Sequence, residues 1–71
     1  MIAVLGAGES GVGAALLAKQ KGYDVFVSDS GSVKNHFQNE LVSAGLEWEQ
    51  GEHNEEKILS ANLLIKSPGI P

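Results

Sequence analysis

The stretch Ile2-Ala3-Val4-Leu5-Gly6-Ala7-Gly8-Glu9-Ser10-Gly11 decides the fold. Its first four residues form an apolar run typical of a buried parallel strand, and the glycines that follow have the G-x-G-x-x-G spacing. Gly6 permits a tight turn, Gly8 lets a phosphate group approach the backbone, and Gly11 lets the next helix pack closely on the sheet. Backbone N–H groups at the start of that helix face the anion. The stretch therefore predicts a loop that binds a nucleotide or a diphosphate.

The next two segments support this prediction. Residues Ser10–Lys21 carry apolar side chains at helical spacing, among them Leu17, and Gly22 is suited to end the helix. The strand that follows, Asp24–Ser28, places Asp29 at its carboxyl end, about 20 residues after the glycine loop. An ionised carboxylate there accepts hydrogen bonds from a ribose hydroxyl or from the donor edge of a base. The alternative is an aspartate that forms only a turn.

The rest of the chain continues to alternate between helix and strand. In chain order we expect a helix capped by Ser32 and ended by Gly45, an edge strand Leu46–Glu49, a turn Gln50–His53, a short helix capped by Asn54, a strand Asn62–Lys66 and a loop Ser67–Pro71. This alternation predicts an α/β fold with a Rossmann-like parallel sheet of four strands in the order 3-2-1-4 and helices on both faces.

The predicted strand order brings two distant loops together. The order reverses beside the first strand, so the glycine loop and Ser67-Pro68-Gly69 are expected to face each other across one crevice. An ordinary strand-ending turn is the alternative for the second loop. The fourth strand has no outer neighbour in this order, so we expect a fragment of a larger protein whose next helix and strand complete the sheet. An uncovered apolar edge also favours self-association.

Composition narrows the function. The 71 residues fit one domain, contain no cysteine and carry a formal charge of -4. These values exclude disulfides and thiolate metal sites, argue against nucleic acid and anionic membranes as partners, and favour the cytoplasm. A bound phosphate must then be held mainly by backbone groups.

Individual polar and aromatic residues add no catalytic or metal site. Ser10 is expected either to contact a phosphate or to cap its helix. His36 and His53 are isolated and expected on the surface, and the acidic cluster is interpreted as a solvated helix start; it comprises Glu52, Glu55 and Glu56. The larger aromatic residues are expected in the core, namely Phe26, Phe37 and Trp48. The G-x-x-x-x-G-K-[ST] loop of many ATP-binding proteins is absent from the sequence.

Three motifs together resemble the start of the bacterial Mur ligases: Val4–Gly11, Val27–Ser30 and Ile65–Pro71. The resemblance implies that residues 1–71 are a domain that binds UDP-N-acetylmuramoyl-L-alanine, a small molecule. The implied contacts are to the diphosphate from the loop Gly8, Glu9, Ser10 and Gly11, to the uridine from Asp29 and Ser30, and across the crevice from Ser67, Pro68 and Gly69. Two positions depart from an ideal site, because Glu9 repels a diphosphate and Gly31 has no side chain to reach the nucleotide.

The resemblance also implies what the whole protein does. It would be an ATP-dependent, amide-forming ligase that adds D-glutamate to the precursor in peptidoglycan biosynthesis, and so contributes to cell shape and division. ATP and Mg²⁺ would bind in a central domain outside this chain, and the chain alone would be inactive. Two other interpretations stay open on the residues themselves: an NAD-binding module of a dehydrogenase or nucleotide sensor, and a structural module that binds no nucleotide.

Overall fold

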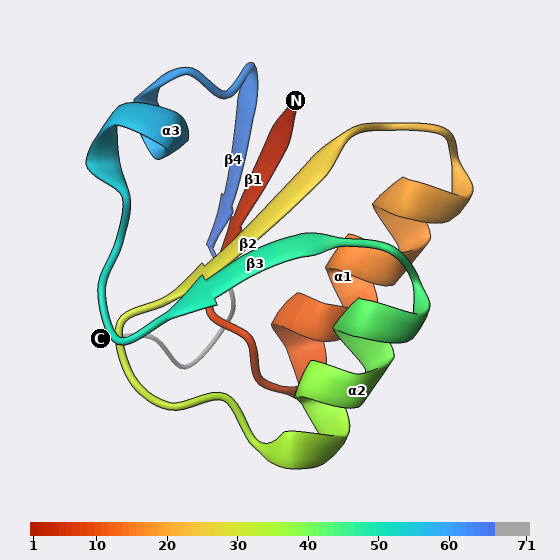
Figure 1. Cartoon of the computed structure of the whole chain (residues 1–71). Helices are drawn as coiled ribbons and strands as arrows, with labels where there is room; N and C mark the ends of the chain where they lie inside the picture. The colour runs from red at the N-terminus through yellow and green to blue at the C-terminus, as the bar shows by residue number, and fades with distance from the viewer. Residues whose placement is uncertain (67–71) are drawn as a thin grey trace.

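Four strands and three helices alternate along residues 1–66, the part of the chain that the computed structural model describes (Figure 1). In chain order they are β1 (Ile2–Leu5), α1 (Glu9–Gln20), β2 (Val25–Asp29), α2 (Asn35–Ser43), β3 (Glu47–Gln50), α3 (Glu55–Leu59) and β4 (Leu63–Lys66). The predicted alternation is confirmed; β1 has the predicted bounds, and ends of the other elements differ by at most three residues. No helix within residues 1–66 is both long enough and apolar enough to span a membrane.

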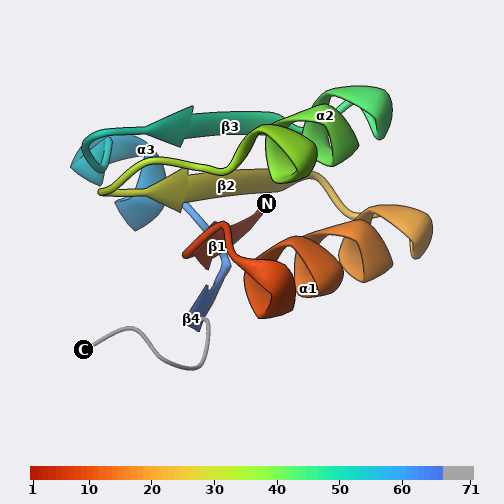
Figure 2. The same cartoon turned by 90° about the horizontal axis from the view of Figure 1, so that it is seen from below.

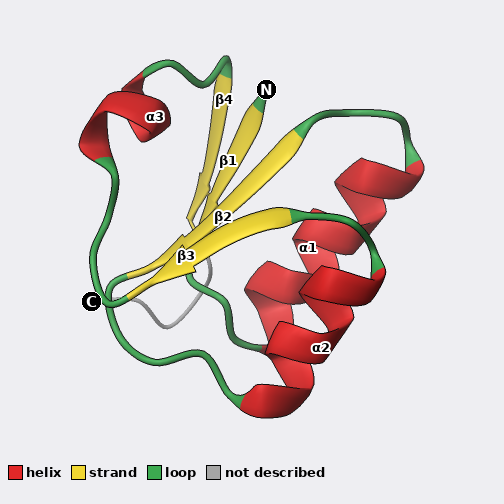
Figure 3. Cartoon of the chain, in the orientation of Figure 1, coloured by secondary structure: helices red, strands yellow, loops and turns green. Residues whose placement is uncertain are grey.

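The sheet has the predicted topology. All three strand pairs are parallel, and the order is β3-β2-β1-β4 (Figure 3). Leu5 of β1 is in register with Ser28 of β2 on one side and with Lys66 of β4 on the other. The carboxyl ends of these strands therefore lie at one edge of the sheet, where ligands bind in open α/β sheets.

One face of the sheet carries the apolar core. Helices α1 and α2 both pack on this face, and α3 lies on the opposite face (Figure 2). The core joins inward side chains of β1 and β2 to α1 and α2, with Val4, Val12, Val27 and Leu41 all at 1% exposure or less. The prediction that Leu17 widens the apolar stripe is wrong, because this side chain lies about 100° around α1 from buried Ala18 and is 54% exposed.

The start of α2 differs from the sequence prediction. Ser32 does not cap the helix; the N-cap is Lys34, whose backbone is still extended at ψ 146°. The cause lies one residue earlier. Val33 is buried at 4% exposure, its N–H donates to Gln50 Oε1 at 2.8 Å, and its carbonyl accepts from Gln38 Nε2 at 2.8 Å. These contacts hold the chain out of helical conformation until Asn35.

The end of α2 explains why β3 begins at Glu47 rather than at Leu46. Gly45 adopts φ +72°, as a glycine after a helix does, and the Leu46 N–H donates to the Leu41 carbonyl at 3.0 Å. Leu46 is buried at 7% exposure and belongs to this helix-ending motif. The prediction of β3 as an edge strand is confirmed.

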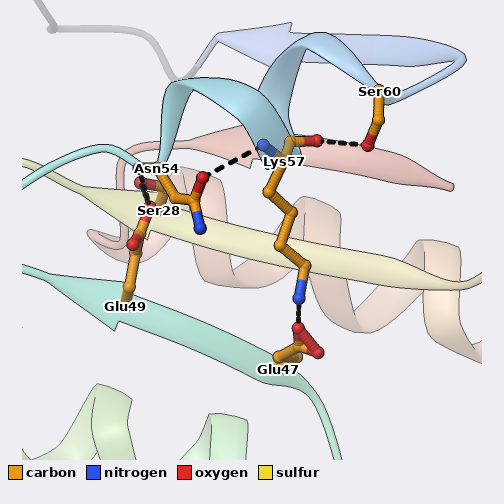
Figure 4. A network of polar contacts seen from close by, with 6 residues as sticks. All are labelled: Ser28, Glu47, Glu49, Asn54, Lys57 and Ser60. Atoms are coloured by element: carbon orange, nitrogen blue, oxygen red, sulfur yellow. Dashed lines mark hydrogen bonds and ion pairs between the residues drawn. The ribbon is translucent and has the colours of Figure 1, made fainter.

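Polar contacts hold α3 to its face of the sheet (Figure 4). Asn54 caps the helix as predicted, since its side chain accepts from the Lys57 N–H at 3.1 Å. The Lys57 side chain extends over β2 and forms an ion pair with Glu47 of β3. Its Nζ lies 4.6 Å from the centre of the buried Phe26 ring. Here a charged side chain and a ring take the place of aliphatic packing.

Candidate functional site

The glycine loop is built as a strand-to-helix turn with an uncapped helix start. Gly6 has φ +102°, which favours glycine, and its N–H donates to the Ser28 carbonyl at 2.8 Å. Gly8 is the N-cap of α1 and has no side chain to cap the first turn. The first-turn amides belong to Glu9, Ser10 and Gly11, and an α-helix gives such amides no partner of its own. They are suited to an anion.

The residues of the glycine loop differ in their exposure to solvent. Glu9 and Ser10 are exposed, and Gly11 is buried, in agreement with its predicted close packing on the sheet. The interpretation of Ser10 as a helix cap is wrong, because the cap position is Gly8 and Ser10 is already the second residue of α1.

Gly8 is a glycine for which the fold itself gives no reason. Its φ of -87° and ψ of -167° are open to any residue, and a Cβ added there would meet no atom of residues 1–66 within 4 Å apart from its chain neighbours. Neither backbone strain nor lack of space therefore requires glycine. Open space directly in front of the helix start is what a phosphate group needs in order to approach the backbone.

Asp29 ties the two loops of the carboxyl edge together. Its Oδ2 accepts from the Ala7 N–H at 2.8 Å, and its Oδ1 accepts from the Gly31 N–H at 2.8 Å. The second contact is the turn that was the alternative interpretation, and the first adds a brace across 22 residues of sequence. Each carboxylate oxygen keeps a second lone pair, so Asp29 retains acceptors for a ligand.

A pocket of about 270 Å³ lies between these two loops. Its lining comes from both loops and the start of α2: Ala7, Gly8, Glu9, Asp29, Ser32, Lys34 and Phe37. Three predicted ligand residues therefore meet at one pocket, namely Gly8, Glu9 and Asp29. Gly11 is buried behind them, and Ser30 is exposed in the adjoining loop. The predicted contacts from Ser67, Pro68 and Gly69 lie outside the described residues.

Sequence reasoning did not assign four residues to this pocket: Ala7, Ser32, Lys34 and Phe37. Phe37 was interpreted only as a core residue, yet it both packs against the core and lines the pocket. Lys34 was not assigned because the low count of basic residues suggested a site made mainly of backbone groups. The available signal was its position, five residues after Asp29 in the loop that leaves β2.

A Ser-His-Glu cluster on the α3 face is structural. The Ser28 Oγ donates to Glu49 Oε2 at 2.6 Å and lies 2.6 Å from His53 Nδ1 (Figure 4 draws the Ser28–Glu49 bond). Because the hydroxyl proton is used by the carboxylate, His53 must donate through Nδ1–H. A histidine that activates a serine accepts that proton instead. Ser28 is also fully buried, which excludes a nucleophile that meets a substrate.

The described residues do not fit a metal centre. Within residues 1–66 no group of three acidic, histidine or cysteine side chains is placed to hold a metal ion. Glu55 and Glu56 lie in the first turn of α3, the helix-start position expected for them, and both are exposed. His36 and His53 are exposed as predicted.

Comparison with known proteins identifies the family. Residues 1–71 match the model of the Mur ligase MurD-like N-terminal domain. The chain is 66% identical over 70 residues to the UDP-N-acetylmuramoylalanine--D-glutamate ligase of Cytophaga hutchinsonii, and 59% identical over 70 residues to that of Bacteroides fragilis. A more distant relative of the same name, from Chlorobium chlorochromatii, is 41% identical.

These matches cover 99% of this chain but only 15 to 16% of each relative. The similarity thus extends over the strand, glycine loop and helix that build the pocket as well as over the rest of the sheet. The chain belongs to the Mur ligase family, as a MurD-like N-terminal domain.

Proposed function

We propose that this chain binds the UDP part of UDP-N-acetylmuramoyl-L-alanine, as the N-terminal domain of a ligase that adds D-glutamate to that precursor. The observation that carries the proposal is the pocket between the glycine loop and the Asp29 loop, at the carboxyl edge of the sheet. The substrate is the one named for the related ligases. The uncapped start of α1 beside this pocket supports binding of the substrate's anionic end there.

The proposed contacts follow from the hydrogen-bonding groups at the pocket. The first-turn amides of α1 hold the diphosphate, because they are donors at the positive end of a helix. Asp29 accepts from the uridine with the lone pairs that its two backbone contacts leave over. Ser30 adds a hydroxyl from the adjoining loop.

In the longer protein, we propose, a carboxylate of the bound precursor is phosphorylated by ATP, with Mg²⁺, to an acyl phosphate and ADP. The amine of D-glutamate then displaces phosphate and forms an amide. Residues 1–66 do not fit ATP and Mg²⁺, since they offer no cluster of metal ligands and no phosphate loop ending in G-K-[ST]. The role of this chain is to hold the precursor, in the cytoplasm, for peptidoglycan biosynthesis.

An NMR titration of the 71-residue chain tests the proposal. Amide shifts are followed on addition of UDP, UDP-N-acetylmuramoyl-L-alanine and NAD. We expect the two uridine ligands to shift amides of Gly6–Gly11 and Asp29–Ser30, with a Kd as weak as about 1 mM. Shifts with NAD alone would support a dehydrogenase-type module instead. No shift with any of the three would contradict nucleotide binding by this chain.

A second measurement concerns catalysis. The chain alone, given ATP, Mg²⁺ and both substrates, is expected to form no ADP, because its sequence contains no ATP loop and residues 1–66 hold no cluster of metal ligands. ADP formation above the level of a denatured control would contradict the assignment of chemistry to the rest of the longer protein.

The open edge of β4 supports a further proposal, self-association of the isolated chain. Leu63 and Leu64 are 53% and 50% exposed on a strand that pairs only with β1 among the described strands. Unpaired strand edges with apolar side chains favour pairing between chains. Sedimentation velocity is expected to show concentration-dependent association that Leu64→Lys reduces; a monomer at all concentrations would contradict it.

A further inference from the structure

Lys34 lines the pocket together with Gly8 and Glu9 of the glycine loop. Of the described residues that line the pocket, it alone carries a positive charge, whereas Glu9 and Asp29 carry negative ones. The pocket side chains therefore sum to a formal charge of -1. A diphosphate brought into such a site needs a cation to offset repulsion from the two carboxylates.

The fold holds the backbone of Lys34 in place. The preceding residue, Val33, is buried, and its N–H and carbonyl are both bonded to glutamine side chains, from β3 and from α2. Lys34 itself begins α2 as its N-cap. A flexible lysine side chain thus extends from a backbone position that two elements, β3 and α2, determine.

Within the described part of the chain, the Lys34 ammonium forms no ion pair with a carboxylate. Among residues 1–66 the ion pair is that of Lys57 with Glu47, on the other face of the sheet, and Lys34 forms none. The Lys34 side chain is exposed, so it keeps the freedom to turn toward a ligand. A charged group that lines a pocket and is not used by the fold is available for binding.

We propose that Lys34 is the cation that pairs with a phosphate of the bound nucleoside diphosphate. This role rests on the proposed function and specifies which part of the ligand the pocket recognises by charge. Lys34 meets the phosphate from the α2 side, while the α1 amides meet it from the other. It also explains how a site that contains Glu9 and lacks a side chain at Gly31 holds a dianionic group.

The test compares UDP with uridine, which lacks the phosphates. Affinities of the 71-residue chain are measured by NMR titration for the wild type, Lys34→Gln, Lys34→Arg and the control Lys21→Gln. The control removes the same charge beyond the far end of α1, at an exposed lysine. Amide spectra of the free variants check that each one folds.

We expect Lys34→Gln to weaken UDP binding about fivefold and to leave uridine binding unchanged. Lys34→Arg keeps the charge and is expected to bind UDP within about twofold of the wild type. Lys21→Gln is expected to bind both ligands as the wild type does. The loss in Lys34→Gln should shrink as salt is added, because an exposed ion pair is screened.

Three results would overturn the inference. Equal UDP affinity of Lys34→Gln and the wild type removes the role of Lys34 and leaves the proposed function intact. An equal loss for UDP and uridine shows that Lys34 contacts the nucleoside and not the phosphates. A wild-type chain that binds no UDP overturns the proposed function, and the role of Lys34 with it.

Discussion

The two faces of the sheet are stabilised in different ways. On the face covered by α1 and α2, Val4, Val27 and Leu41 are fully buried in an apolar core. On the α3 face, the contacts of β2 and β3 are a buried hydroxyl bonded to a carboxylate and an ion pair that lies over an aromatic ring. Leu59 of α3 is 83% exposed.

The difference indicates that apolar burial supplies most of the stability, whereas the polar contacts fix where the elements lie. Apolar burial is non-directional and scales with area, so the α1/α2 face is expected to carry most of the free energy of folding. A hydrogen bond contributes less in net terms but requires a particular geometry. On the α3 face, Glu49 accepts from both the Ser28 hydroxyl and the Asn54 N–H, and so ties β2, β3 and the start of α3 together.

The largest expected effect is a loss of stability on the α1/α2 face, and the same Leu→Ala substitution in α3 serves as its control. Leu41→Ala removes a fully buried side chain and is expected to lower the free energy of unfolding by about 3 kcal/mol. That is most of the roughly 5 kcal/mol available to a chain of this size. Leu59→Ala, the matched control, is expected to change it by less than about 0.5 kcal/mol. Urea denaturation followed by circular dichroism measures both. Similar losses for the two variants would contradict the division between the faces.

A smaller loss in the free energy of unfolding is expected from a substitution on the α3 face. Ser28→Ala removes a buried hydroxyl from Glu49 and His53 and is expected to cost about 1 kcal/mol, since both partners are partly accessible to water. Ser60→Ala is the matched control, because the Ser60 hydroxyl is exposed and bonds only the Lys57 carbonyl. The same denaturation experiment applies. A cost above about 3 kcal/mol for Ser28→Ala would place the main stabilisation on this face.

Much of this architecture could be predicted from the sequence. The apolar run before Gly6, the acidic residue at the end of β2 and the alternation of helix and strand were enough for the sheet order, because each is a local pattern with one common outcome. The N-cap of α2 could not be predicted. Ser32 is the better capping residue by type, but burial of Val33 and its two glutamine partners overrode that preference.

The candidate site was predictable only in part for a similar reason. Gly8, Glu9 and Asp29 follow a recognisable spacing, and the structure places all three at one pocket. The contribution of Lys34 depends on where the chain leaves the core after Val33, which is a tertiary property. Likewise, no sequence pattern indicates that both oxygens of Asp29 bond backbone amides of two different loops.

At the carboxyl edge of the sheet, Asp29→Asn tests the two hydrogen bonds that the Asp29 carboxylate accepts from the Ala7 and Gly31 amides. The amide keeps one acceptor and places an NH₂ group against either the Ala7 or the Gly31 N–H, so one of the two bonds is lost. We expect a cost of about 1 kcal/mol and weaker UDP binding. Asp24→Asn, at an exposed aspartate before β2, is the control. Unchanged amide shifts of Ala7 and Gly31 would contradict the brace.

Gly8→Ser has the smallest expected effect on stability and the sharpest consequence for the site. Serine is a good N-cap, the backbone at Gly8 is already extended, and the added atoms meet free space, so the free energy of unfolding is expected to rise by a few tenths of a kcal/mol. The new side chain occupies the approach to the α1 amides, and UDP binding is expected to weaken about tenfold. Gly13→Ser, an equally open glycine within α1 and away from this pocket, should leave binding unchanged. A variant that is more stable yet binds worse means that Gly8 serves the ligand and not the fold. Unchanged UDP affinity in Gly8→Ser would instead show that the glycine spacing serves the turn alone.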